Sequence, residues 1–118
     1  MTTRDTIEAY FRSLRQKTGW DSFLSDDMTF TSFAGPTKRV TGRAAYLDST
    51  KRFFSMITAV EVRDILVDGH KACALTRYDL QPPAGPAFRS DVAEVFEVRE
   101  GKITALEIYF DSSPFPKK

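Results

Sequence analysis

The segment from Phe88 to Asp111 constrains the fold more than any other part of the chain. It is rich in Val, Phe, Ile and Tyr, and its apolar residues alternate with a period of two, which is typical of β-strands. Glu100-Gly101 divides the segment and predicts the turn of a long β-hairpin. Because Glu rarely adopts a positive φ, the sequence favours a type I turn with a glycine bulge over a primed turn.

The alternation sorts the side chains of this hairpin into two faces. The first strand divides into two sets, Arg89, Asp91, Ala93 and Val95 on one face and Ser90, Val92, Glu94, Phe96 and Val98 on the other. Both faces contain large apolar residues, so we expect both to be covered at least in part. The sequence therefore indicates a sheet with helices on one side and a partner on the other.

Composition and charge exclude several function classes. The chain has 118 residues, of which 42% are hydrophobic and 28% charged, as in one soluble globular domain. A formal net charge of +1 gives no reason to expect a nucleic-acid partner. No apolar run approaches the roughly 20 residues that span a bilayer, so we expect no membrane partner.

The single cysteine and the polar N-terminus bear on location and cofactors. Cys73 alone excludes an internal disulfide, and the N-terminus lacks a signal-peptide pattern, so we expect a cytoplasmic protein. One His and one Cys argue against a zinc site of His and Cys ligands. The sequence implies no metal and no other cofactor.

The order of expected elements predicts the fold class. Helical patterns cover Thr3–Lys17, Trp20–Leu24 and Gly42–Met56. Strands are expected over Met28–Phe33, Ile57–Asp68, Lys71–Leu80 and the two halves of the hairpin. Gly and Pro mark loops or turns at Ala34–Gly42, Asp68-Gly69 and Gln81–Pro86, and we expect a flexible tail at about 113–118. Residues 1–118 should form a single α+β domain, a cone-shaped barrel whose strongly bent mixed or antiparallel sheet wraps around about three helices.

Three signatures follow one another along the chain. They are Asp26-Asp27-Met28-Thr29-Phe30, then Val40-Thr41-Gly42-Arg43, then Phe96-Glu97-Val98-Arg99-Glu100-Gly101-Lys102-Ile103 with Tyr109-Phe110-Asp111. In this order they resemble the nuclear-transport-factor-2-like superfamily, including its SnoaL-like proteins, over nearly the whole chain. The resemblance implies a fold that hosts isomerases, hydrolases, cyclases, dehydratases and binders without catalysis. It also implies a homodimer through the outer face of the sheet, where we expect Tyr78, Phe96, Val98 and Tyr109.

Arg77 and Asp79 are the first candidates for catalysis. A spacing of two on a strand points both side chains to one face. Cys73 and Leu75 share that face, which we expect to lead towards an apolar interior. The alternative is a solvated ion pair at the rim, which would contribute little.

The segment from Leu75 to Asp79 is similar to the Arg-x-Asp strand of limonene epoxide hydrolases. There an Arg lies between two aspartates that activate water and protonate the epoxide. The position of the second aspartate is Ile108 here, and the positions of the water-holding Tyr and Asn fall at about Phe30 and Ser32. Three of the five residues therefore differ, which argues against epoxide hydrolysis.

Asp91 is the third candidate. The strand from Ser90 to Val95 is similar to the ketosteroid isomerase strand that carries a protonated aspartate in the oxyanion hole. Because Asp91 shares a face with apolar residues, we expect its pKa to lie above that of an ordinary Asp. The alternative is a polar strand residue paired with Arg77 or Arg89. The isomerase's general base falls at about Ser32, so that base is missing here.

The remaining side chains complete a pocket hypothesis. We expect the substrate-binding wall to consist of Tyr10, Trp20, Phe30, Ser32, Phe53 and Ile108. Glu94 and Glu107 are expected to face outward. The chain would then bind a small, largely apolar molecule in the cone and could catalyse acid–base chemistry. The alternative is a non-catalytic dimeric module for ligand binding or protein interaction. A cavity of roughly 300 Å³ or more would favour a ligand, and a cavity filled by side chains would favour the interaction role.

Overall fold

The computed structural model describes residues 2–34 and 36–115 of the chain. Its helices are α1 (Thr3–Gln16), the short 3₁₀ helix η1 (Trp20–Phe23) and α2 (Arg43–Met56). Its strands are β1 (Leu24–Ser32), β2 (Lys38–Thr41), β3 (Ile57–Asp68), β4 (Lys71–Leu80), β5 (Phe88–Arg99) and β6 (Lys102–Phe110). No helix in the described ranges is long and apolar enough to cross a membrane.

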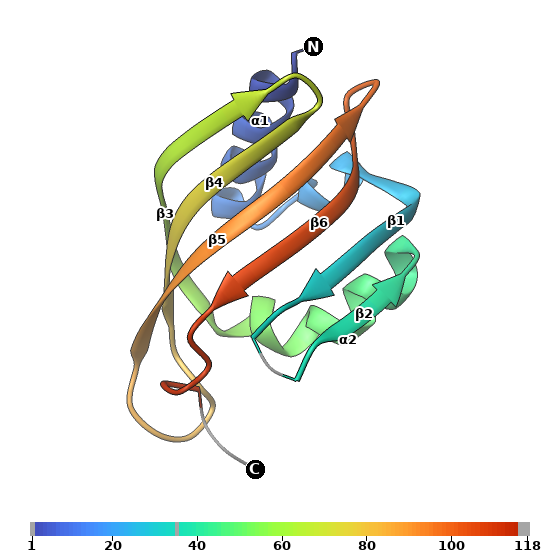
Figure 1. The fold of residues 1–118 in the computed structure, drawn as a ribbon. Helices are drawn as coiled ribbons and strands as arrows, with labels where there is room; N and C mark the ends of the chain where they lie inside the picture. The colour runs from blue at the N-terminus through green and yellow to red at the C-terminus, as the bar shows by residue number, and fades with distance from the viewer. Residues whose placement is uncertain (1, 35, 116–118) are drawn as a thin grey trace.

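All described strands belong to one sheet, in the order β2-β1-β6-β5-β4-β3. β1 and β6 run parallel, and the other neighbours are antiparallel, so the sheet is mixed. It is strongly bent and both helices lie on the same side of it, while β2 and β3 remain as two open edges (Figure 1). This arrangement confirms the predicted α+β fold.

Helix α1 shows why these residues fold as predicted. Thr2 and Asp5 form a reciprocal capping box, in which the Asp5 backbone N–H donates to Thr2 Oγ1 at 3.0 Å. Four apolar residues recur at helical spacing and are buried: Ile7, Tyr10, Phe11 and Leu14. The rings of Tyr10 and Phe11 pack edge-to-face on Phe96 of β5, at 5.8 and 6.0 Å between centroids. This contact fills the α1 end of the cone.

The register of β4 and β5 decides which side chains lie beneath the helices. Paired residues share a face, and the buried pairs are Ala72–Phe96, Ala74–Glu94, Thr76–Val92 and Tyr78–Ser90. The alternation had sorted these residues correctly, but the expected direction of the faces was wrong. Tyr78, Phe96 and Val98 lie in the core instead of on the outer face, because the apolar side of α1 must bury the more apolar set.

Two local predictions are corrected. Glu100 and Gly101 both have positive φ, 51° and 74°, so the hairpin turn is primed. A primed turn matches the twist of the flanking strands, and this outweighs a left-handed penalty of about 1–2 kcal/mol at Glu100. The segment 34–42 also contains β2, whose Val40 pairs with Phe30 of β1. The Pro and Gly that indicated a loop precede or follow this short strand.

The C-terminal segment is described as far as Phe115. Phe115 contacts the rings of Phe88 and Phe110 at 5.0 and 5.2 Å between centroids. The expected flexible tail at 113–118 stays a prediction, and residues 116–118 of it lie outside the described ranges.

The orientation of β5 predicts a contrast between two neighbouring substitutions. Phe96→Ala should lower the free energy of unfolding by about 3–5 kcal/mol, because Phe96 is fully buried between α1 and the sheet. Val95→Ala, on the outer face, should lower it by about 1 kcal/mol or less. Urea unfolding of both variants measures the contrast, and equal losses would contradict the orientation.

Candidate functional site

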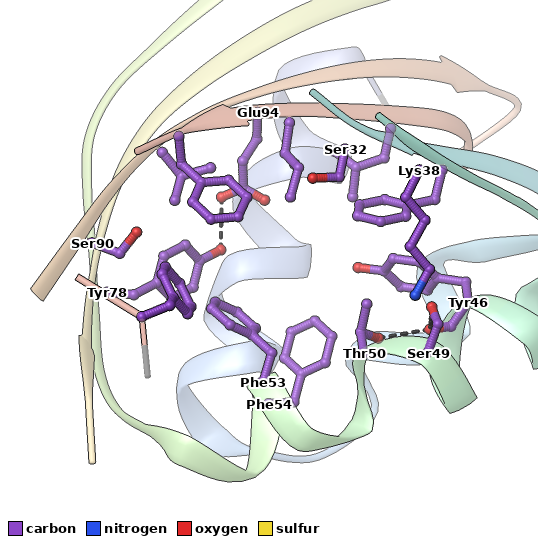
Figure 2. Close-up of a pocket in the computed structure, with 16 residues that line it drawn as sticks. Ser32, Lys38, Tyr46, Ser49, Thr50, Phe53, Phe54, Tyr78, Ser90 and Glu94 are labelled. Atoms are coloured by element: carbon purple, nitrogen blue, oxygen red, sulfur yellow. Dashed lines mark hydrogen bonds between the residues drawn. The ribbon is translucent and has the colours of Figure 1, made fainter. Parts of the chain in front are cut away.

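A cavity of about 240 Å³ lies between α2 and the inner face of the sheet (Figure 2). Its apolar wall comprises Phe30, Phe53, Phe54, Val92, Leu106, Ile108, Phe110 and Phe115. Its polar lining comprises Ser32, Lys38, Tyr46, Ser49, Thr50, Tyr78, Ser90 and Glu94. The volume equals that of about eight water molecules and falls below the 300 Å³ expected for a drug-sized ligand. The cavity therefore does not reach the volume expected to favour a ligand, although side chains do not fill it.

Glu94 brings a carboxyl group into this apolar wall. The residue is only 4% exposed, and its carboxyl group points into the cavity (Figure 2). Its Oε2 accepts hydrogen bonds from Thr76 Oγ1 at 2.6 Å and from Tyr78 Oη at 2.7 Å. No donor from the described part of the chain reaches Oε1. One carboxyl oxygen is therefore held by the protein and the other is available to a ligand.

Burial changes the acidity of this group. It raises the pKa of Glu94 from 4.5 to about 7, although the hydrogen bonds from Thr76 and Tyr78 act in the opposite direction. Near neutral pH the group therefore exists in both protonation states. That property suits a side chain that takes up and releases a proton in a reaction.

Two further tyrosines lie beside this carboxyl group. Tyr46 projects from α2 with its hydroxyl directed into the cavity (Figure 2), and it hydrogen-bonds to the buried Tyr10 hydroxyl of α1. Burial, together with the charge of Glu94, raises the pKa of Tyr10, Tyr46 and Tyr78. All three phenols stay neutral at physiological pH, and Tyr46 can donate a hydrogen bond to a ligand.

The predicted catalytic set lies on the other side of the sheet. Arg77, Asp79 and Asp91 are on the outer face and none lines the cavity, so their expected position beneath the helices was wrong. Arg77 Nε donates to Asp91 Oδ1 at 2.7 Å, and Arg89 Nε donates to Asp79 Oδ1 at 2.8 Å. The Arg77–Asp91 pair matches the alternative interpretation of Asp91, whereas Asp79 pairs with Arg89 and not with Arg77. Exposed ion pairs of this kind contribute little to stability.

The pKa of Asp91 also differs from the raised value expected from the sequence. The hydrogen bond from Arg77 holds the pKa of Asp91 below its usual range. The residue is exposed and ionised, so the proposed protonated acid is not at this position. The two faces of β5 are the reverse of those expected. Glu94, expected to point outward, therefore lies in the core.

Comparison with known protein families and sequences identifies the family of this chain. A family profile described as the SnoaL-like domain matches residues 7–106. The chain belongs to the SnoaL-like family. Its members fall within the nuclear-transport-factor-2-like superfamily, as the sequence signatures indicated. A search among curated protein sequences finds no match.

Solved structures share this SnoaL-like fold. A Bacillus subtilis protein provisionally assigned as an isomerase superposes with a TM-score of 0.81 at 19% identity, covering 96% of this chain and 91% of that one. A Mesorhizobium loti protein provisionally assigned as a SnoaL-like polyketide cyclase gives 0.76 at 21% identity, covering 92% and 99%. A Kribbella flavida protein gives 0.77 at 25% identity, covering 94% and 88%.

Most of the expected pocket wall is present in this SnoaL-like domain. Phe30, Ser32, Phe53 and Ile108 line the cavity, and their role in binding stays a prediction. Tyr10 does not line the cavity but stands behind Tyr46, and Trp20 packs instead on the ring of Phe54 at 4.4 Å between centroids. No group of three or more potential metal ligands occurs within the described residues.

Glu94 was missed because the two faces of β5 were assigned in reverse. A signal was available in the sequence, since Glu94 shares its face with Val92, Phe96 and Val98, the more apolar of the two sets. A lone carboxylate within an apolar set indicates a buried ionisable group. The sequence also predicts a loop at Lys38, whereas β2 brings its side chain to the edge of the cavity (Figure 2).

The raised pKa of Glu94 predicts a dependence of stability on pH. Between about pH 4.5 and pH 7 the folded state keeps a proton that the unfolded state has lost. The free energy of unfolding should therefore fall by about 3 kcal/mol as the pH rises through this range. Glu94→Gln should remove this fall, which urea unfolding at several pH values measures.

Glu107→Gln is the matched control, because Glu107 pairs in register with Val95 on the outer face. The control should unfold with the pH dependence of the wild type. If Glu94→Gln did the same, the carboxyl group would not be titrating in the protein interior.

Proposed function

We propose that this SnoaL-like domain catalyses proton transfer at a carbon atom of a small, largely apolar carbonyl compound held in the cavity. The observation that carries the proposal is the Glu94 carboxyl group, buried in an apolar wall and with one oxygen directed at the space for a ligand. Its pKa of about 7 is matched to a general acid or base at neutral pH.

The reaction uses groups that already lie around the cavity. Oε1 of ionised Glu94 takes a proton from a carbon next to the carbonyl, and the electron pair of the C–H bond moves towards the carbonyl oxygen. The Tyr46 hydroxyl, neutral and directed into the cavity, donates a hydrogen bond to that oxygen. Protonated Glu94 then returns the proton to the same carbon or to another carbon of the conjugated system.

The hydroxyl groups of Thr76 and Tyr78 act on Glu94 and not on the substrate. Both donate to Oε2, which fixes the carboxyl group and lowers its pKa from the value that burial alone would give. The fold relatives support this class of reaction, since two of them are provisionally assigned as an isomerase and as a polyketide cyclase.

Exchange of carbon-bound hydrogen tests this function directly. Acetophenone is a small aryl ketone whose methyl protons lie next to the carbonyl, and NMR in D₂O follows their replacement by deuterium. We expect the protein to accelerate exchange, with kcat/KM rising as the pH increases through about 7, because Glu94 must be ionised to act as the base. Glu94→Gln should reduce the acceleration by roughly 10²- to 10⁴-fold.

Tyr78→Phe removes a donor that lowers the Glu94 pKa, so it should move the midpoint of the pH profile to higher pH. Tyr109→Phe, on the exposed outer face, should leave the profile unchanged. Binding of acetophenone without any exchange would refute catalysis and favour the non-catalytic binder.

We also propose that the outer face of the sheet forms a homodimer. Leu75, Ala93 and Tyr109 are neighbours across β4, β5 and β6, and the exposed Phe33 ring stacks on Tyr109 at 4.8 Å. Adjacent exposed aromatic and aliphatic side chains favour burial against a second copy, and the Arg77–Asp91 ion pair borders them.

Leu75→Glu should convert the dimer to a monomer, because it places a charge among these apolar side chains. Sedimentation velocity measures the change. Ser55→Glu, on the exposed surface of α2, is the control and should leave the dimer intact. A monomeric wild-type protein would refute this interface.

A further inference from the structure

Ser90 places a second polar group in the cavity, apart from Glu94. The residue is 3% exposed and lines the cavity. Its Oγ has no hydrogen-bond partner within the described part of the chain. A buried hydroxyl without a partner is unfavourable in a folded protein, so this hydroxyl is positioned for a group that the chain itself does not supply.

The position of Ser90 relative to Glu94 follows from the strand register. Tyr78 of β4 pairs directly with Ser90 of β5, whereas the hydroxyl at the far end of the Tyr78 side chain donates to Glu94. One tyrosine ring therefore spans the wall between the two groups, as Figure 2 also shows. Both Ser90 and Glu94 point to the inner face, because they are separated by an even number of residues on one strand.

We propose that Ser90 determines specificity for ligands in which a single ring separates two oxygen atoms. The carbonyl end lies at Glu94 and Tyr46, and a hydroxyl or carbonyl oxygen at the opposite end of the ring hydrogen-bonds to Ser90 Oγ. The ring lies along the apolar wall that Val92 and Phe53 help to form. This inference rests on the proposed function only in taking the Glu94 end as the place of reaction.

The test uses three probes that differ at one position. They are acetophenone, para-methylacetophenone and para-hydroxyacetophenone, of which the last two have similar shapes but differ in hydrogen bonding. We expect the wild type to bind the hydroxyl probe roughly 3- to 10-fold more tightly than the methyl probe, as measured by NMR titration. In Ser90→Ala this ratio should fall to about one, and in Ser90→Thr, which keeps the hydroxyl, it should be largely restored.

Ser55→Ala is the matched control, because Ser55 is exposed on α2 and its hydroxyl donates to the Arg52 carbonyl outside the cavity. It should keep the wild-type ratio. Urea unfolding without a probe gives a second readout: Ser90→Ala should have an unchanged or higher midpoint, since it removes a buried group that lacks a partner.

Three results would overturn the inference: an unchanged ratio in Ser90→Ala, a clearly lower unfolding midpoint in that variant, or no binding of any probe by the wild type. The two proposals fail separately. Hydroxyl-selective binding that depends on Ser90 but gives no hydrogen exchange would refute catalysis and support the role of Ser90. Hydrogen exchange that depends on Glu94, without selectivity for the hydroxyl probe, would support catalysis and refute the role of Ser90.

Discussion

The packing of α1 on the inner face of β5 is the constraint on which the rest of the molecule depends. The Tyr10 and Phe11 rings must contact Phe96, and this contact fixes which side of the strand is buried. Once Phe96 points inward, every second residue along the strand does so too, including Glu94, Val92 and Ser90. The apolar contact at one end of the cone therefore determines which polar groups reach the cavity at the other.

Burial of the Glu94 carboxyl group in an apolar wall destabilises its charged form. The same burial raises the basicity that the site would use. An apolar wall disfavours a charge, and the described residues supply two hydrogen bonds, from Thr76 and Tyr78, to compensate for the loss of water. Both bonds go to one oxygen, so the other oxygen lacks a protein partner in the described ranges. Complete compensation would have stabilised the charged form and given an ordinary carboxylate of low basicity.

Most of the fold and about half of the candidate site could be predicted from the sequence. Helical spacing located α1 and α2, period-two alternation located β3 to β6, and three ordered signatures indicated the family. Alternation groups residues by face, but it contains no direction, because direction comes from contacts distant in the sequence. Ser32 and Ile108, located by the resemblance to epoxide hydrolases, and Phe53, located by helical spacing, line the cavity, whereas the acid was predicted at Asp91, three residues from Glu94 and on the opposite face of β5. The edge strand β2 was missed because its pairing with β1 outweighs the local Gly and Pro signals.

The two open edges of the sheet have a consequence for solubility. An edge strand exposes unpaired backbone groups that can pair with another chain and start aggregation. Along β3 the regular pairing is interrupted between Val62 and Asp64, and the charged Arg63 and Asp64 are exposed at the interruption. At the opposite edge β2 is only four residues long and begins with Lys38-Arg39. Short, interrupted and charged margins of this kind disfavour fibril-like growth at the edges of a sheet that does not close into a barrel.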